Sequence, residues 1–190
     1  YKTNEDDTFT KLNDPDGLSY GTNSGVAFSP DGGLLAVTYN GSSRITIYKK
    51  NEDDTFTKLS NPNVLPAGQG DGVAFSPDGG YLAVTHYDYP YVTIYKKNEN
   101  NTFTKLNDPD GLPTRSGRGV AFSPDGGLLA VTHNGSPYII IYKADFNNLK
   151  INKVIDNKLP SNAQFNHLGY MKEGGVAGET KKVISIVNSY

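Results

Sequence analysis

GVAFSPDGG occurs at residues 25–33, again at 72–80 and again at 119–127, with a constant step of 47 residues. A second string keeps the same step, reading YKTNEDDTFTKL at 1–12 and YKKNEDDTFTKL at 48–59. Self-similarity at a period of about 20 to 50 residues marks a solenoid, a propeller or another array, in which each copy buries its apolar face against the next. The fold therefore depends on what one copy forms.

One copy is expected to form four short strands. GVAFSP at 72–77 alternates large apolar residues with small ones, which is typical of a half-buried strand. The SPDGG turn then leads into YLAVTH at 81–86, because Pro fixes the first corner and Gly supplies the positive φ. The β-branched YVTIYKK at 91–97 and the short TFTKL at 102–106 complete the set. Four antiparallel strands in one copy describe a β-propeller blade.

Composition agrees with an all-β chain, since 21 Gly, 11 Pro, 13 Tyr and 8 Phe among 190 residues favour strands and turns over helices. We expect propeller blades over residues 1–155, with an outer strand at 8–12 and blades that begin at 25, 72 and 119. A small C-terminal β tail is expected at 156–190. Three blades do not close a ring. The ring is therefore partial, and either earlier blades are missing or copies of the chain assemble to complete it.

The repeat has a recognisable pattern, VAFSPDGxxLAVT followed by xxIxIYK. This pattern resembles the WD-repeat-like propellers of bacteria and their phages over about residues 1–155, although the Trp-Asp pair of the eukaryotic repeat is absent. In the tail, LGYMKEGGVAGETKKVISI at 168–186 is similar to the ending of several phage structural and tail-fibre proteins. That similarity implies a propeller displayed on a virion, with the tail as attachment or oligomerising element. A hairpin that caps the last blade is the alternative.

The copies differ mainly in two sets of loops that a propeller places on one face of the disc. They span residues 18–23, 65–71, 112–118, 39–44, 86–91 and 133–138. Differences confined to one face indicate a binding surface, with neutral drift in exposed loops as the alternative. Aromatic and Arg side chains there would suit a glycan or protein surface. The candidate binding residues are Tyr39, Arg44, His86, Tyr87, Tyr89, Tyr91, Arg115, Arg118, His133 and Tyr138.

Catalytic and metal-binding patterns are weak. His86 and His133 occupy equivalent positions, but a zinc site needs three or four ligands and the chain has no Cys, so no metal and no cofactor are expected. Ser76 and its two equivalents precede a Pro in a turn and look structural. The inner strand of each copy carries mainly Gly, Ala, Val and Phe. We therefore expect that the protein is not an enzyme.

Charge and hydropathy limit the classes of partner that the protein is expected to bind. A net charge of −2 offers no basic excess for nucleic acid, and no apolar run reaches the length of a membrane span. The sequence thus predicts a non-enzymatic binding or structural module, in which a phage tail, fibre or bacterial surface presents the variable loops to a glycan or protein. Self-association is also expected. The predicted location is a virion, the extracellular space or the cell surface, with the cytoplasm as the alternative. An intracellular scaffold and a lactonase-like propeller enzyme, whose blades also contain SPDG, remain open.

Overall fold

Strands make up the regular structure of the protein. The computed structural model describes residues 2–3, 8–18, 21–144, 164–165 and 171–172. The chain divides into two compact units, residues 1–144 and 145–190. The described residues contain fifteen strands and no helix, so the all-β prediction is confirmed. Among them there is accordingly no helix with the length and apolar character needed to cross a membrane.

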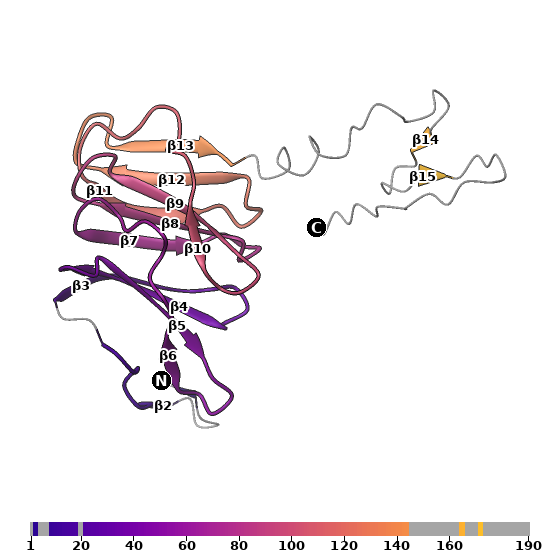
Figure 1. The fold of residues 1–190 in the computed structure, drawn as a ribbon. Coiled ribbons are helices and arrows are strands. Elements are labelled where there is room, and N and C mark those ends of the chain that lie inside the picture. The colour runs from indigo at the N-terminus through magenta and orange to yellow at the C-terminus, as the bar shows by residue number, and fades with distance from the viewer. Residues whose placement is uncertain (1, 4–7, 19–20, 145–163, 166–170, 173–190) are drawn as a thin grey trace. The chain divides into compact units, whose positions relative to one another are not determined.

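Three antiparallel sheets follow one another along the chain and stack face to face (Figure 1). Blade 1 consists of β3 (Thr22–Phe28), β4 (Leu34–Asn40), β5 (Ile45–Lys50) and β6 (Phe56–Lys58). Blade 2 consists of β7 (Gly70–Phe75), β8 (Tyr81–His86), β9 (Val92–Lys97) and β10 (Phe103–Lys105). Blade 3 consists of β11 (Gly117–Phe122), β12 (Leu128–His133) and β13 (Ile139–Lys143). The expected four-stranded blade is confirmed, in a partial propeller.

Two short strand pairs stand outside these blades. β1 (Lys2–Thr3) and β2 (Phe9–Thr10) pair antiparallel, with Lys2 opposite Thr10. Lys49 stands opposite Thr57 in blade 1 in the same way, so the N-terminal pair repeats the two outer strands of a blade. In the second unit, β14 (Gln164–Phe165) pairs with β15 (Met171–Lys172). The fourth strand expected after β13 and most of the predicted tail lie outside the described residues.

The SPDGG turn joins the first two strands of every blade by the same side-chain hydrogen bonds. In blade 1 the Ser29 hydroxyl donates to Asp31 (2.5 Å) and accepts from the Leu34 N–H (2.8 Å). Asp31 also accepts from the Gly33 N–H, and Gly32 has the positive φ that the turn requires. The hydroxyl of Ser29 is the main cause of the lowered pKa of Asp31. These serines are structural, as the sequence indicated.

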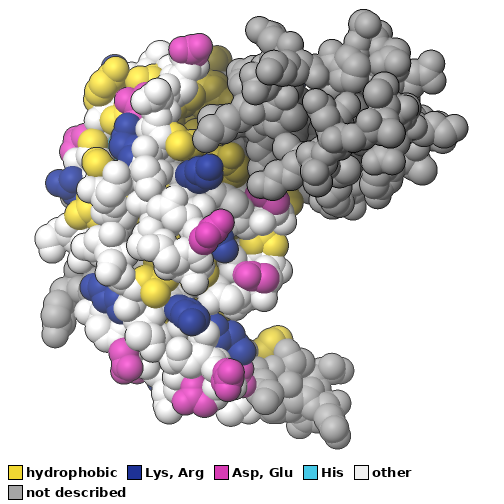
Figure 2. All heavy atoms as spheres, turned by 45° about the vertical axis from the view of Figure 1, so that its right-hand side comes forward, with side chains coloured by type: hydrophobic (Ala, Val, Ile, Leu, Met, Phe, Trp, Pro, Cys, Tyr) yellow, Lys and Arg dark blue, Asp and Glu magenta, His cyan; other side chains and the backbone are white. Residues whose placement is uncertain are grey.

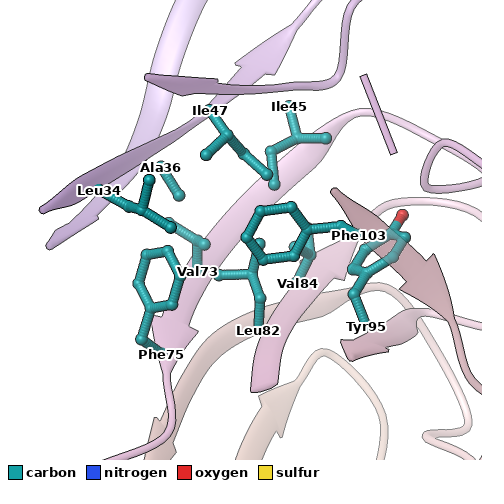
Figure 3. Packing of buried hydrophobic residues seen from close by; sticks show 10 residues of the cluster. All are labelled: Leu34, Ala36, Ile45, Ile47, Val73, Phe75, Leu82, Val84, Tyr95 and Phe103. Carbon is teal, nitrogen blue, oxygen red and sulfur yellow. The ribbon is translucent and has the colours of Figure 1, made fainter. Parts of the chain in front are cut away.

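The core lies between the blades, where the apolar faces of neighbouring sheets meet (Figure 3). Blade 1 contributes four residues, Leu34, Ala36, Ile45 and Ile47. Blade 2 contributes six, Val73, Phe75, Leu82, Val84, Tyr95 and Phe103. Each large side chain buried in this way stabilises the fold by about 1.5–3 kcal/mol, so blade stacking is the main source of stability.

Glycines on the innermost strands let adjacent blades approach backbone to backbone. A Cβ added at Gly72 would lie 2.5 Å from the carbonyl oxygen of Arg118 in the next blade. At the same place the Thr85 hydroxyl accepts from the Gly72 N–H (2.8 Å) and donates to the Arg118 carbonyl (2.5 Å). Gly25, Thr38 and Asp71 make the equivalent contacts between blades 1 and 2. The inner strand is therefore rich in Gly because blades must pack there.

One face of the molecule shows no large field of charge of one sign (Figure 2). On the face seen in Figure 2, basic and acidic side chains are interspersed rather than segregated. This distribution accords with the small net charge of −2. The surface in view therefore provides no extended basic patch of the kind that binds nucleic acid.

Candidate functional site

An open groove of about 550 Å³ lies where the loops of blades 2 and 3 meet. Its walls come from the β8–β9 loop, from residues 114–118 around the start of β11 and from the β12–β13 loop. The lining residues are Tyr87, Asp88, Tyr89, Tyr91, Thr114, Arg115, Ser116, Arg118 and Asn134. We refer to this set as the groove. Both loop sets that vary between the copies contribute to it.

A network of hydrogen bonds fixes the floor of the groove. The Ser116 hydroxyl donates to the Tyr87 carbonyl oxygen (3.0 Å), and the Asn134 N–H donates to the Ser116 carbonyl oxygen (3.0 Å). The guanidinium of Arg118 donates through Nε to Asn134 Oδ1 (3.2 Å) and through Nη1 to Asp71 Oδ2 (2.7 Å). Arg118 is thus held by two side chains from different blades and presents an oriented donor.

Aromatic rings form one wall of the groove. Tyr89 and Tyr91 meet edge to face, with ring centroids 5.9 Å apart. Tyr87 and Tyr89 are exposed, so their ring faces are open to a ligand. Arg115 is also exposed and makes no ion pair with any residue that the structure describes. The groove therefore combines stacking surfaces with a cationic side chain that is free to contact a ligand.

Five of the ten candidate residues from the sequence line the groove, namely Tyr87, Tyr89, Tyr91, Arg115 and Arg118. Tyr138 is exposed but is not among the lining residues. Tyr39 is buried, with its hydroxyl 3.3 Å from that of Tyr48. Arg44 donates to the Pro66 carbonyl oxygen (2.6 Å) and holds a loop. Burial and loop contacts therefore give Tyr39 and Arg44 a role in packing.

His86 is fully buried and is a structural residue. Its Nδ1 lies 2.8 Å from the Asp88 carbonyl oxygen, and its Nε2 lies 2.9 Å from the Thr93 hydroxyl. A carbonyl oxygen only accepts, so Nδ1 carries the proton and Nε2 accepts from Thr93. Burial lowers the pKa of His86 to about 4, which keeps the ring neutral at pH 7.

His133, the equivalent residue in blade 3, is buried with different partners. Its Nδ1 accepts from the Gly135 N–H (3.3 Å), so Nε2 carries the proton of the neutral ring. Nε2 has no hydrogen-bond partner among the described residues, because Ile140 occupies the position that Thr93 has in blade 2. The two histidines do not form a joint site. Within the described parts of the chain, no three His, Cys, Asp or Glu side chains gather as metal ligands.

The sequence did not single out four of the residues that line the groove, namely Asp88, Thr114, Ser116 and Asn134. All four lie in the loops that differ between copies, so the loop pattern could have found them. Small polar residues are common in any loop, and this is why aromatic and Arg residues drew attention instead.

Comparison with known proteins places the chain among propellers. The family model described as "Lactonase, 7-bladed beta-propeller" matches residues 25–164. No curated protein matches the chain. Among solved structures, a putative 6-phosphogluconolactonase from Bacteroides uniformis is 19% identical with a TM-score of 0.55, covering 66% of this chain and 38% of that protein.

Two further structures share the fold. The periplasmic gluconolactonase of Pseudomonas aeruginosa is 20% identical with a TM-score of 0.53, covering 67% of this chain and 38% of that one. The β-propeller domain of Myceliophteria thermophila Cps50 (Swd1) is 16% identical with a TM-score of 0.56, covering 68% of this chain and 42% of that one. The chain spans 38% to 42% of the length of these structures.

The family match corrects the function expected from the sequence. A non-enzymatic phage tail, fibre or bacterial surface module is wrong, and so is the expectation of no enzyme, because the matched model is that of lactonases. The phage-like ending of the tail finds no support in these comparisons. The error has a physical cause, since Gly72 and its equivalents reflect close blade packing. The absence of functional side chains at these glycines is therefore no argument against catalysis.

Proposed function

Because the chain belongs to the Lactonase family of seven-bladed β-propellers, we propose that it forms part of an enzyme that hydrolyses lactones. The observation that carries this proposal is the match over residues 25–164, which covers the three described blades except for the first three residues of β3. Solved neighbours named as gluconolactonases support a polyhydroxylated sugar lactone as the class of substrate. The groove is the proposed place of binding.

The groove has the chemistry to hold such a ring. The exposed faces of Tyr87 and Tyr89 stack on the apolar face of a sugar ring. Arg118, oriented by Asp71 and Asn134, donates to ring hydroxyls or to the lactone carbonyl. The free guanidinium of Arg115 would add affinity for a substrate that carries a phosphate or carboxylate.

Hydrolysis requires a group that removes a proton from water. Water attacks the lactone carbonyl carbon, the bond between that carbon and the ring oxygen breaks, and the ring oxygen leaves as a hydroxyl. Asp88 is the one carboxylate among the described residues that line the groove, and we assign it as the general base. A guanidinium beside the carbonyl stabilises the oxyanion that forms during the attack.

The test is hydrolysis of glucono-δ-lactone and of its 6-phosphate by the 190-residue chain, measured as acid release above the uncatalysed rate. Activity on either compound is the expected result. Preference for the phosphorylated compound that disappears in Arg115→Gln, but not in Lys96→Gln, would support the groove as the binding site. No hydrolysis of either lactone at any protein concentration would overturn the proposal.

Asp88→Asn should lower kcat by roughly 100-fold or more with little change in KM, because the amide cannot accept the proton. The substitution keeps the shape of the side chain and leaves the backbone oxygen that His86 contacts. Glu99→Gln is the matched control, since Glu99 is an exposed acid in the β9–β10 turn, outside the groove. Equal activity of both variants would remove Asp88 from the mechanism.

A further inference from the structure

The tripeptide Asn-Gly-Ser occurs at equivalent places in two blades, at 40–42 in blade 1 and at 134–136 in blade 3. In an Asn-Gly pair the backbone nitrogen of the glycine lies next to the side-chain amide carbon of the asparagine, and a bond between them closes a succinimide ring. Glycine has no Cβ that would shield this nitrogen. The two groups are already held together, so a base and a stabilised oxyanion are what the reaction still needs. The surroundings of each pair therefore decide how fast it reacts.

In blade 3 a base contacts the nucleophile. The Gly135 N–H donates to Nδ1 of His133 (3.3 Å), so the lone pair of the imidazole points at the proton that must leave. Nε2 of the same ring has no hydrogen-bond partner among the described residues, and the contact with Gly135 therefore selects this tautomer. The ring is buried, which limits its movement. His133 is thus placed to act as a general base for the Gly135 nitrogen.

A guanidinium contacts the electrophile. Nε of Arg118 donates to Oδ1 of Asn134 (3.2 Å), the oxygen that becomes negative when the amide carbon is attacked. Nη1 of Arg118 donates to Asp71 Oδ2 (2.7 Å) on blade 2, which fixes the orientation of the guanidinium. The backbone of Asn134 is also held, because its N–H donates to the Ser116 carbonyl oxygen (3.0 Å). A donor that is already oriented toward a developing oxyanion lowers the barrier to attack.

Blade 1 holds the same tripeptide without these groups. Tyr39 stands at the position of His133, and a phenol is a much weaker base than an imidazole. Ser24 stands at the position of Arg118 and carries no charge. The equivalent positions therefore supply Asn40 with neither a base nor a guanidinium. The chain thus contains a matched internal control.

We propose that Asn134 is a site of self-modification, at which the protein converts its own asparagine to aspartate or isoaspartate. The Gly135 nitrogen attacks the side-chain carbonyl carbon of Asn134 and gives its proton to His133. The bond from that carbon to Nδ2 then breaks, His133 passes the proton to the departing nitrogen, and ammonia leaves a succinimide behind. Water opens the succinimide at either carbonyl, so that one amide is exchanged for one carboxylate.

The product changes the charge of the groove. The amide oxygen of Asn134 is a neutral partner of Arg118, whereas a carboxylate at position 134 forms a second ion pair with a guanidinium that already contacts Asp71. Two carboxylates beside Arg118 oppose the approach of a further anion. The modification therefore lowers the affinity of the groove for anionic ligands as the protein ages. The reaction itself involves the chain's own amide and does not depend on lactone hydrolysis.

The experiment is incubation of the folded 190-residue chain at neutral pH, followed by peptide mapping with mass spectrometry that separates aspartate from isoaspartate products. Asn134 should be converted about tenfold faster than Asn40 or more, because general-base catalysis contributes a factor of at least this order. In the chain unfolded by urea, the two Asn-Gly-Ser sites should react at similar rates. This control separates the effect of the fold from that of the tripeptide.

Two variants test the two groups. His133→Tyr copies the residue that blade 1 has at this position, and Arg118→Met removes the guanidinium, so each should slow the conversion of Asn134 toward that of Asn40. Lys96→Met is the matched control, since Lys96 is an exposed cation outside the groove. Circular dichroism checks that each variant is folded, and one folded variant suffices for the comparison. A wild type in which Asn134 reacts no faster than Asn40, or an unchanged or higher rate in either folded variant, would overturn the proposal.

Discussion

At the scale of single residues, the buried imidazole of His86 should couple folding to pH. Burial lowers its pKa from 6.5 to about 4, so the folded protein keeps it neutral where the unfolded chain binds a proton. Between these two values the unfolded state holds more protons, and stability falls as the pH falls. The free energy of unfolding should drop by about 2 kcal/mol from pH 7 to pH 5, as urea denaturation would measure.

The control for this effect is His86→Tyr, because Tyr39 occupies the same position in blade 1. The variant should lose most of the difference between pH 7 and pH 5. Asp31 and Asp125 have lowered pKa values, caused mainly by hydrogen bonds from serine hydroxyls, so their contribution is lost only at more acidic pH. An unchanged pH difference in the variant would mean that another group titrates.

At the scale of strands and blades, β7 packs so closely against β11 that the stability of the fold should be sensitive to a single added methyl group. A Cβ at Gly72 would meet the Arg118 carbonyl oxygen at 2.5 Å and the Thr85 hydroxyl at 2.8 Å. The same position in blade 3, Gly119, has only the Thr132 hydroxyl nearby, at 3.0 Å. Gly72→Ala should therefore cost about 1–3 kcal/mol of stability, and Gly119→Ala clearly less. Thermal unfolding of the two variants side by side measures the difference, and equal losses would contradict it.

The elements were predictable from the sequence because their signals are local and occur three times. Alternation and the SPDGG turn define the strands, and β8 begins and ends where YLAVTH does. The burial of His86 was not predictable, since it depends on contacts outside its own strand, such as that of its Nε2 with Thr93 on the third strand of the blade. Asp88 was not predicted as a site residue for a related reason. Its place in the groove depends on how the loops of two blades meet, and no local pattern records that.

At the scale of the whole molecule, blade 2 is covered on both sides, and its stability should exceed that of its neighbours. All six residues of β8 are buried, whereas β13 alternates between exposed and partly buried positions. Local opening costs most where packing is densest. Amide hydrogen exchange in dilute protein should therefore be slowest in β8 and faster in β3 and β13. Equal protection of all three blades would contradict this expectation.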